Sequence, residues 1–283
     1  RAQIQGSLNL CLCCICGVIY HMEDIMNKLA EALNISDKTR PQVWAHRGAS
    51  GYCPENTLPA FLKAHELGAD GIELDVQMSS DGELVVCHDE KVDRTSSGSG
   101  WIKDMTLAEL RSLDFSGGRA EFAGVTIPTM REVFELIATT DMIINVELKT
   151  GIVFYTDMAE KLLQLAAECD CEDRVLYSSF NHYTITHMRE LNPDAKLGFL
   201  YADGTIGMPD YAVRYGVQAL HPALYNIQFP GFIEECKRKG LAVNVWTVNE
   251  EEHMKLAVSA GVDAIITNYP DKALAVIEKQ YEH

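Results

Sequence analysis

Residues 68–89 read GADGIELDVQMSSDGELVVCHD. The run at 71–76 is apolar apart from Glu73 and Asp75, which is typical of a strand buried on both faces of a parallel sheet. The SSDG stretch at 79–82 predicts a turn, and a second short β-rich run follows at 84–88. We expect these two runs to pair as a hairpin.

On either side of this stretch, β-rich runs alternate with helical patterns. Seven further strands are expected at 43–46, 142–147, 174–178, 196–200, 217–221, 241–246 and 263–267. Helical patterns occur at 57–67, 157–168, 183–191, 231–239, 250–259 and 271–279, and capping boxes at 106–109 and 129–132 mark two more helix starts. This alternation predicts an α/β protein with a TIM (β/α)8 barrel. A doubly wound open sheet is the structural alternative.

One segment interrupts the alternation. Residues 89–128 contain a single short helical pattern and several glycines. Because connections of this length in compact domains are usually functional, we interpret the segment as a small insertion after the second strand, over one mouth of the barrel. The barrel domain is expected to span 41–283. Residues 1–40 are interpreted as an N-terminal extension that could be partly vector-derived.

Composition and charge limit the classes of partner. The chain has 283 residues and a net charge of −17, and no run of Lys or Arg is long enough for a nucleic-acid patch. The apolar run at 8–20 is shorter than the roughly 20 residues of a membrane-spanning helix, so no stable membrane insertion is expected. Nine cysteines indicate free thiols and a cytoplasmic location: five are scattered without zinc-ligand spacing, and four at 11–16 are too close together for an ordinary zinc site, with a metal knot there as the alternative. A homo-oligomer is compatible with the sequence.

Three carboxylates are expected at one end of the barrel. Glu73 and Asp75 are two residues apart in a strand, so they face the same side. Glu147 ends the third strand in the same relative place, and the C-terminal ends of barrel strands converge on one mouth. Such a cluster suits a hard divalent cation, Mg²⁺ or Ca²⁺, and Mn²⁺ is also compatible. Strand-end ion pairs with Lys or Arg are the alternative.

Two histidines are expected at the same mouth. His46 ends the first strand and His88 ends the hairpin strand, so one neutral imidazole could take a proton while the other, protonated, gives one. The planar guanidinium of Arg47 suits a phosphate, and a salt bridge to Glu73 is its alternative role.

Two further side chains are candidates for the pocket. Lys149 follows Glu147 by two residues and is expected to point the same way, either to neutralise a phosphate oxygen or to hold Glu147. Trp246 ends the seventh strand, where it could form a wall of the pocket or belong to the core. His221, which ends the sixth strand, is a weaker candidate.

Three stretches together resemble the glycerophosphodiester phosphodiesterase family: HRGASGYCPENTLPAF at 46–61, GADGIELDVQMSSDGELVVCHD at 68–89 and VELK at 146–149. The resemblance runs from about residue 43 to the C-terminus. It implies a TIM barrel with an insertion after the second strand, and metal-dependent hydrolysis of glycerophosphodiesters to sn-glycerol 3-phosphate and an alcohol. The substrate is then a small molecule such as glycerophosphocholine.

The resemblance also implies a role for each matching residue. It makes His46 and His88 the acid–base pair, and we ourselves prefer His46 as the base and His88 as the acid. It implies metal ligands at Glu73, Asp75 and Glu147. Phosphate-contacting groups are implied at Arg47 and Lys149, and a segment that shapes the site at Glu55 and Asn56. The nucleophile stays open between a neighbouring glycerol hydroxyl, which would give a cyclic phosphate, and water.

Two other functions are compatible with this pattern. A lipid phosphodiesterase of the lysophospholipase D kind requires an apolar patch near the mouth, for which residues 115–127 and 229–232 are candidates. A non-catalytic phosphodiester-binding barrel is disfavoured because both histidines and all three carboxylates are present.

Overall fold

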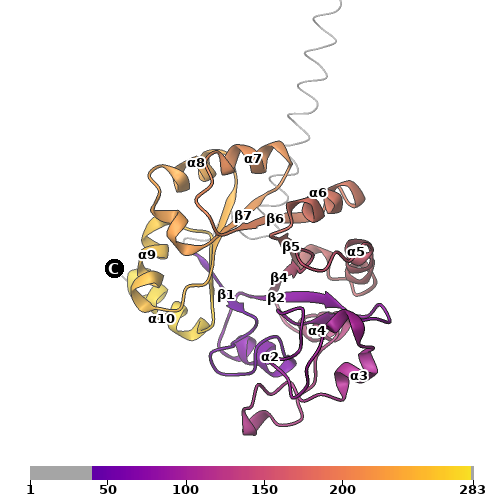
Figure 1. Cartoon of the computed structure of the whole chain (residues 1–283). Coiled ribbons are helices and arrows are strands. Elements are labelled where there is room, and N and C mark those ends of the chain that lie inside the picture. The colour runs from indigo at the N-terminus through magenta and orange to yellow at the C-terminus, as the bar shows by residue number, and fades with distance from the viewer. Residues whose placement is uncertain (1–39, 282–283) are drawn as a thin grey trace, which may run out of the picture. The chain divides into compact units, whose positions relative to one another are not determined.

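A computed structural model of the chain describes residues 40–281 (Figure 1). Eight parallel strands form a closed barrel, because β1 pairs with β9 on one side and with β2 on the other. This closure confirms the predicted TIM barrel and excludes the open sheet. The strands are β1 (Gln42–His46), β2 (Gly71–Met78), β4 (Ile143–Leu148), β5 (Val175–Ser179), β6 (Lys196–Tyr201), β7 (Ala219–Pro222), β8 (Ala242–Val245) and β9 (Ala264–Thr267).

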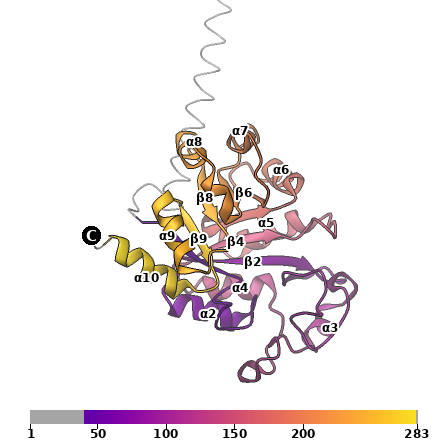
Figure 2. The same ribbon diagram turned by 60° about the vertical axis from the view of Figure 1, so that its left-hand side comes forward.

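Helices surround the barrel, as two views show (Figures 1 and 2). One helix, α7 (Met208–Arg214), was not expected from the sequence; it has seven residues and follows Gly207, whose φ is 75°. The helices of this outer layer are α2 (Leu58–Glu66), α4 (Met130–Ile137), α5 (Met158–Glu168), α6 (His182–Leu191), α7 (Met208–Arg214), α8 (Phe232–Arg238), α9 (Glu251–Ala260) and α10 (Pro270–Tyr281).

The two faces of β2 differ in chemistry. Ile72 and Leu74 are completely buried and belong to the same apolar cluster as Phe61 of α2 and Phe134 of α4. The alternate positions carry polar side chains, which therefore face the inside of the barrel. A strand that is buried on both sides can thus be apolar toward the helices and acidic toward the barrel interior.

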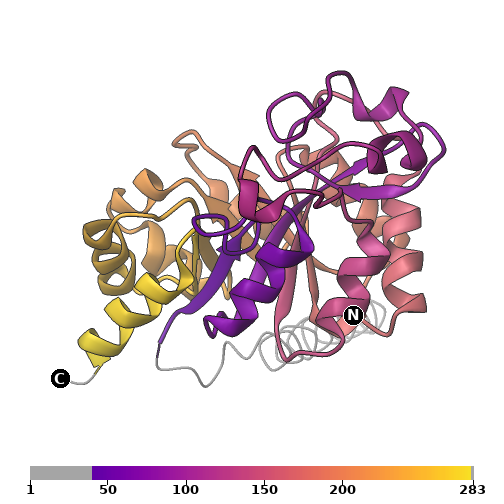
Figure 3. The same ribbon diagram turned by 90° about the horizontal axis from the view of Figure 1, so that it is seen from below.

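The segment between β2 and α4 lies at one end of the barrel, in the violet and magenta part of Figure 3. The predicted hairpin is present, since β3 (Leu84–Val86) runs antiparallel to β2. Two 3-10 turns (Ile102–Asp104 and Ala120–Phe122) and the short helix α3 (Leu107–Arg111) follow. Both predicted capping boxes are formed, at Thr106 and Thr129. The segment has its own small core, made of Val85, Cys87, Val92, Ile102, Leu110, Phe115 and Ile127.

The interpretation of residues 1–40 concerns a part of the chain that lies, apart from Arg40, outside the described residues. Arg40 itself forms a two-pronged ion pair with Asp70, with hydrogen bonds of 2.9 and 3.0 Å. Within residues 40–281, no helix combines the length and the apolar character that crossing a membrane requires.

Candidate active site

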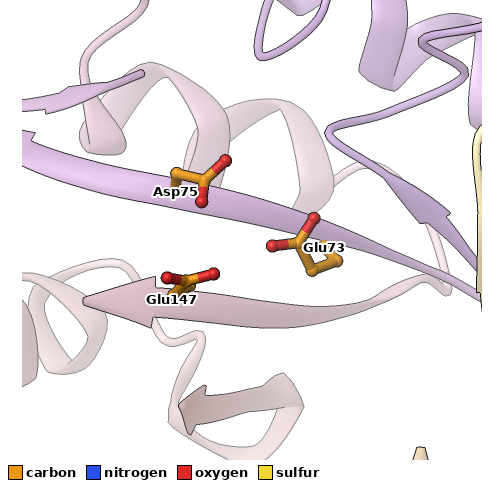
Figure 4. Close-up of side chains that lie close together, drawn as sticks. All are labelled: Glu73, Asp75 and Glu147. Carbon is orange, nitrogen blue, oxygen red and sulfur yellow. The ribbon is translucent and has the colours of Figure 1, made fainter. Parts of the chain in front are cut away.

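Three carboxylates converge inside the mouth of the barrel (Figure 4). Glu73 and Asp75 come from β2 and Glu147 from β4, and Asp75 faces Glu147 in the register of the two strands. One oxygen from each carboxylate lies within 4.8 Å of the other two. All three residues are less than 8% exposed. The sequence-based expectation of a shared acidic cluster therefore agrees with the geometry.

The three carboxyl groups of this cluster differ in how far their surroundings shift the pKa of each. Burial and the Asp75 carboxylate raise the pKa of Glu147 to about 7, and the same causes raise the pKa of Glu73 well above its ordinary value. Burial also opposes ionisation of Asp75, but Lys149 and Arg47 outweigh it and hold the pKa of that carboxyl below its usual range. The Asp75 Oδ1 atom is buried and accepts no hydrogen bond within residues 40–281. Three buried oxygen donors with one unused acceptor fit a hard divalent cation.

Two cationic side chains lie against the carboxylates. Lys149 Nζ donates a hydrogen bond of 2.8 Å to Glu147 Oε1 and lies 3.6 Å from Asp75 Oδ1. Arg47 Nε lies 3.4 Å from Asp75 Oδ2. The salt bridge that we considered between Arg47 and Glu73 is not formed between their side chains in the described residues. The Arg47 backbone N–H donates to Glu73 Oε2 at 3.0 Å, and the guanidinium pairs with Asp75 and Glu55. Its guanidinium thus stays beside the mouth.

Unusual backbone conformations bring the PENT segment, residues 54–57, to the site. Arg47 and Asn56 both have a φ of 56°, in the left-handed region that non-glycine residues rarely adopt. Their backbones are joined by a hydrogen bond of 3.0 Å from Asn56 N–H to the Arg47 carbonyl. The Asn56 side chain then donates to Asp75 Oδ2 at 2.8 Å. Glu55 accepts a hydrogen bond of 2.8 Å from Arg47 Nη1.

Both predicted histidines are oriented through Nδ1. His46 Nδ1 donates to Asn268 Oδ1 at 2.7 Å, and His88 Nδ1 donates to Asp89 Oδ1 at 2.6 Å. The Nε2 atom of each ring is therefore the one available for proton transfer. Burial and the neighbouring Arg47 lower the pKa of His46 to about 4, so this imidazole is neutral.

A pocket of about 70 Å³ joins these groups. It is lined by both histidines, Arg47, Glu73 and Glu147, and also by the apolar residues Phe180, Leu200, Trp246 and Ile266. Trp246 is one of them; its Nε1 donates to the His221 carbonyl at 2.7 Å, and its ring meets Phe180 edge-on with centroids 5.5 Å apart. The His221 side chain is fully buried beside Trp44 and is not among the lining residues.

Three groups around the pocket were not expected from the sequence: Phe180, Asn268 and Asp89. Phe180 and Asn268 each follow the end of a barrel strand, β5 and β9, so the strand-end rule that selected Trp246 could have found them. Asp89 adjoins His88 in the sequence, but its role as the hydrogen-bond acceptor for His88 depends on the loop conformation.

A TIM barrel whose mouth gathers buried carboxylates, two cations and two oriented histidines is typical of an enzyme that acts on phosphate esters. Comparison with known proteins makes this more specific. The model of the "Glycerophosphoryl diester phosphodiesterase family" matches residues 46–272. A protein of Caldanaerobacter subterraneus subsp. tengcongensis named glycerophosphodiester phosphodiesterase is 47% identical over 84% of this chain and 98% of its own length.

Solved structures agree with this assignment. A phosphodiesterase of Oleispira antarctica in complex with the product sn-glycerol-3-phosphate is similar with a TM-score of 0.75 and 31% identity, covering 84% of this chain and 97% of that chain. A glycerophosphodiester phosphodiesterase structure from Agrobacterium tumefaciens has a TM-score of 0.74 at 28% identity, covering 83% of this chain and 99% of that chain. This chain therefore belongs to the glycerophosphoryl diester phosphodiesterase family, and the prediction that it is a phosphodiesterase is confirmed.

Proposed function

We propose that this chain hydrolyses glycerophosphodiesters to sn-glycerol 3-phosphate and an alcohol, with a divalent cation and two histidines. The observation that carries the proposal is the pocket in which Glu73, Glu147, Arg47 and both histidines meet. The solved relative from Oleispira antarctica, which holds sn-glycerol-3-phosphate, supports the choice of product.

The phosphodiester is expected to bind beside the carboxylates. Glu73, Asp75 and Glu147 would hold a divalent cation, which would supply positive charge for the phosphate oxygens; Mg²⁺ or Ca²⁺ fits three carboxylates, with Mn²⁺ also compatible. Arg47 and Lys149 contribute two more positive charges, which stabilise negative charge that develops on the phosphoryl group. Trp246 and Phe180 form the apolar wall that bounds the substrate.

We assign the two histidines different roles because the groups that accept a hydrogen bond from Nδ1–H differ. His46 donates Nδ1–H to a neutral amide, so its Nε2 is free to remove a proton from the nucleophile. His88 donates Nδ1–H to the Asp89 carboxylate, which orients the ring so that its Nε2 can protonate the leaving oxygen as the P–O bond breaks. The nucleophile is a neighbouring glycerol hydroxyl or water. A cyclic phosphate intermediate, seen or absent by phosphorus NMR during turnover, separates these two routes.

The decisive experiment is a product assay with glycerophosphocholine and glycerophosphoethanolamine. We expect sn-glycerol 3-phosphate and the free alcohol in equal amounts, loss of activity in EDTA, and recovery with Mg²⁺, Ca²⁺ or Mn²⁺. Activity indifferent to EDTA would contradict the metal site, and no turnover of either substrate with any of the three metals would contradict the proposed function.

A lysophospholipid is a second candidate substrate, because apolar side chains surround part of the mouth. In residues 40–281 the four most exposed large apolar side chains are those of Ile206, Tyr183, Ile152 and Phe154, each at least 70% exposed. Ile152 and Phe154 lie in the segment that follows β4, Tyr183 in the first turn of α6 after β5, and Ile206 in the segment that follows β6, so all four lie beyond the C-terminal ends of adjacent strands. Phe180, 47% exposed, connects this surface to the pocket.

The apolar surface differs from the one expected from the sequence. Phe229 does contribute, at 48% exposure, but Phe115 and Ile127 are buried in the core of the insertion. The stretches 150–157, 180–183 and 202–207 contain no Lys or Arg, which favours a zwitterionic lysophospholipid over an anionic lipid.

Choline release from lysophosphatidylcholine tests this second candidate. We expect Ile206→Ser and Phe154→Ser to slow that reaction while release from glycerophosphocholine is unchanged. Leu256→Ser on α9, 40% exposed, is the matched control and should change neither. Failure of the unmodified protein to act on lysophosphatidylcholine would eliminate the lipid substrate and leave the hydrolysis of glycerophosphodiesters intact.

A cytoplasmic location also belongs to the proposal. It is supported by Cys53, Cys87, Cys171 and Cys236, which are buried free thiols. Fractionation of the source cells, followed by immunodetection of the protein, tests this location directly.

A further inference from the structure

The insertion contributes one arginine that bridges two carboxylates from different parts of the chain. Arg94 donates from Nη1 to Glu55 Oε2 and from Nη2 to Glu55 Oε1, each at 2.7 Å. It also donates from Nε to Asp89 Oδ2 at 2.7 Å and from Nη2 to Asp89 Oδ1 at 3.1 Å. The guanidinium thus makes two bidentate pairs at once, a geometry that lysine cannot reproduce.

Each of these carboxylates also holds a residue of the pocket. Glu55 Oε1 accepts from Arg47 Nη1 at 2.8 Å, and Asp89 Oδ1 accepts from His88 Nδ1 at 2.6 Å. An unbroken chain of charged groups therefore runs from Arg47 to His88, with Arg94 at its centre.

Both ends of this chain are anchored. On the insertion side, Val92 is buried in the small core, and its N–H donates to the Gly100 carbonyl at 3.0 Å. On the barrel side, Asn56, the neighbour of Glu55, is bonded to Asp75. Arg94 is 48% exposed, and exposed ion pairs are usually weak, but a bidentate network between anchored segments is the exception.

We propose that Arg94 is a positioning residue for the reaction, which orients His88 through Asp89 and Arg47 through Glu55. Arg94 touches neither the pocket nor the carboxylate cluster. Without Arg94, Glu55 and Asp89 keep their negative charges but lose the cation between them, so they repel each other. The contact of Glu55 with Arg47 and that of Asp89 with His88 are then no longer held in place. This inference rests on the proposed function, and in particular on His88 as the acid.

The two arms of the network have different kinetic consequences. A misplaced His88 slows only the protonation of the leaving group. Choline leaves as an alkoxide that needs this proton, whereas p-nitrophenolate is stable enough to leave without it. A misplaced Arg47 weakens stabilisation of the phosphoryl group, which affects substrates with either leaving group. The ratio of activities on the two kinds of substrate therefore reports on the His88 arm alone.

The test compares kcat for glycerophosphocholine with kcat for glycerol p-nitrophenyl phosphate, in the variants Arg94→Met and Arg94→Lys. For both variants we expect kcat with glycerophosphocholine to fall by about 100-fold, since misplacement of a catalytic group by about 1 Å costs about this factor. With the p-nitrophenyl substrate the fall should be at least several-fold smaller. Arg94→Lys should not rescue, because it restores the charge without the two bidentate pairs.

Two variants separate the arms. Asp89→Asn should reproduce the selective loss on glycerophosphocholine, and Glu55→Gln should lower activity on both substrates equally. Combined with Arg94→Met, each should cost less than the sum of the single effects, because the residues act through one network. Arg131→Met is the matched control, since Arg131 is 51% exposed and pairs with Glu168 away from the site; it should retain full activity.

Equal losses on both substrates for Arg94→Met, or full activity on both, would overturn the positioning role. Either result with an active unmodified enzyme leaves the proposed function standing. An unmodified enzyme that hydrolyses neither substrate contradicts the proposed function itself. Circular dichroism and the unfolding midpoint of each variant identify misfolded protein, and the substrate ratio stays informative for any variant that retains activity.

Discussion

Asp75 and Glu147 occupy facing positions in the register of β2 and β4, so two buried carboxylates lie side by side at the mouth of the barrel. Lys149 compensates part of this charge, with Nζ 2.8 Å from Glu147 and 3.6 Å from Asp75. Together with Glu73, the pair has more acidic oxygens than the neighbouring cations satisfy, because Asp75 Oδ1 accepts no hydrogen bond within the described residues. A divalent cation bound between these carboxylates would neutralise the remaining negative charge.

Glu147→Gln tests that role with little change in shape. We expect divalent metal affinity to fall by more than about 100-fold, and kcat/KM for glycerophosphocholine to fall at least as far, because one of three anionic oxygens is lost. Isothermal titration calorimetry and the product assay measure the two effects. Glu172→Gln, at an exposed position in a 3-10 turn, is the matched control. Unchanged metal affinity in Glu147→Gln would remove Glu147 from the site.

Metal binding is expected to strengthen as the pH rises through about 7. In the metal-free protein the pKa of Glu147 is raised to about 7 by burial and Asp75, and that of Glu73 is raised well above its ordinary value. Protons must therefore leave these groups before a cation can bind. Titrations in two buffers of different ionisation enthalpy measure the protons released. A pH-independent affinity between pH 6 and 8 would contradict these raised pKa values.

The same shifts predict how pH changes the stability of the metal-free protein. A carboxyl whose pKa is higher in the folded than in the unfolded state binds more protons when folded. Its contribution to stability is present below about pH 4.5 and is lost as the pH rises through the folded pKa, which for Glu147 is about 7. Saturating metal should therefore raise the unfolding temperature more at pH 8 than at pH 6, as calorimetry can check. A larger metal-induced rise in unfolding temperature at pH 6 than at pH 8 would contradict the predicted direction.

Removal of either histidine should abolish most of the activity. General acid–base groups contribute about 100-fold to 10,000-fold each, so His46→Ala and His88→Ala are expected to lower kcat by at least about 100-fold. Both should retain metal affinity. His187→Ala is a control in which an exposed ion pair with Glu160 is lost far from the pocket. Single variants within about tenfold of the unmodified enzyme would contradict the acid–base assignment.

The residues that could be predicted from the sequence are those whose position follows from strand geometry. Glu73, Asp75 and Glu147 end apolar runs on the same side, and the closure of the barrel brings such ends together. His46 and Trp246 follow from the same rule. The helix α7 was missed although it carries start and stop signals, with Pro209 in its first turn and Gly216 two residues after Arg214; α8, which has the same length, was predicted.

Contacts made by the insertion were beyond sequence reasoning. Arg94 reaches Glu55 across 39 positions, and this pairing depends on how the insertion folds back over the mouth. Asn268 orients His46 from 222 positions away, but His46 ends β1 and Asn268 directly follows the adjacent strand β9, so strand geometry could have brought them together. The apolar surface around Ile206 and Phe154 was missed for the same reason, since loop side chains have no period that predicts exposure.

The left-handed backbone of Asn56 gives a prediction about stability. Its φ of 56° favours glycine or asparagine, and alanine there costs about 1–2 kcal/mol. Asn56→Ala and Asn56→Gly both lose the hydrogen bond to Asp75, so their difference isolates the backbone. We expect the Ala variant to be less stable than the Gly variant by about 1 kcal/mol, as urea unfolding can measure.

The usual order of these two residues is the opposite, which makes the comparison diagnostic. Glycine has the larger conformational entropy when unfolded, so at ordinary φ values alanine is the more stable replacement. Asn192, at the C-terminus of α6 with a φ of −136°, provides the matched control, and there Ala should be at least as stable as Gly. Asn56→Ala as stable as Asn56→Gly would mean that the PENT segment relaxes out of the left-handed region. In that case Glu55, and with it Arg94, would not depend on the Asn56 backbone for their positions.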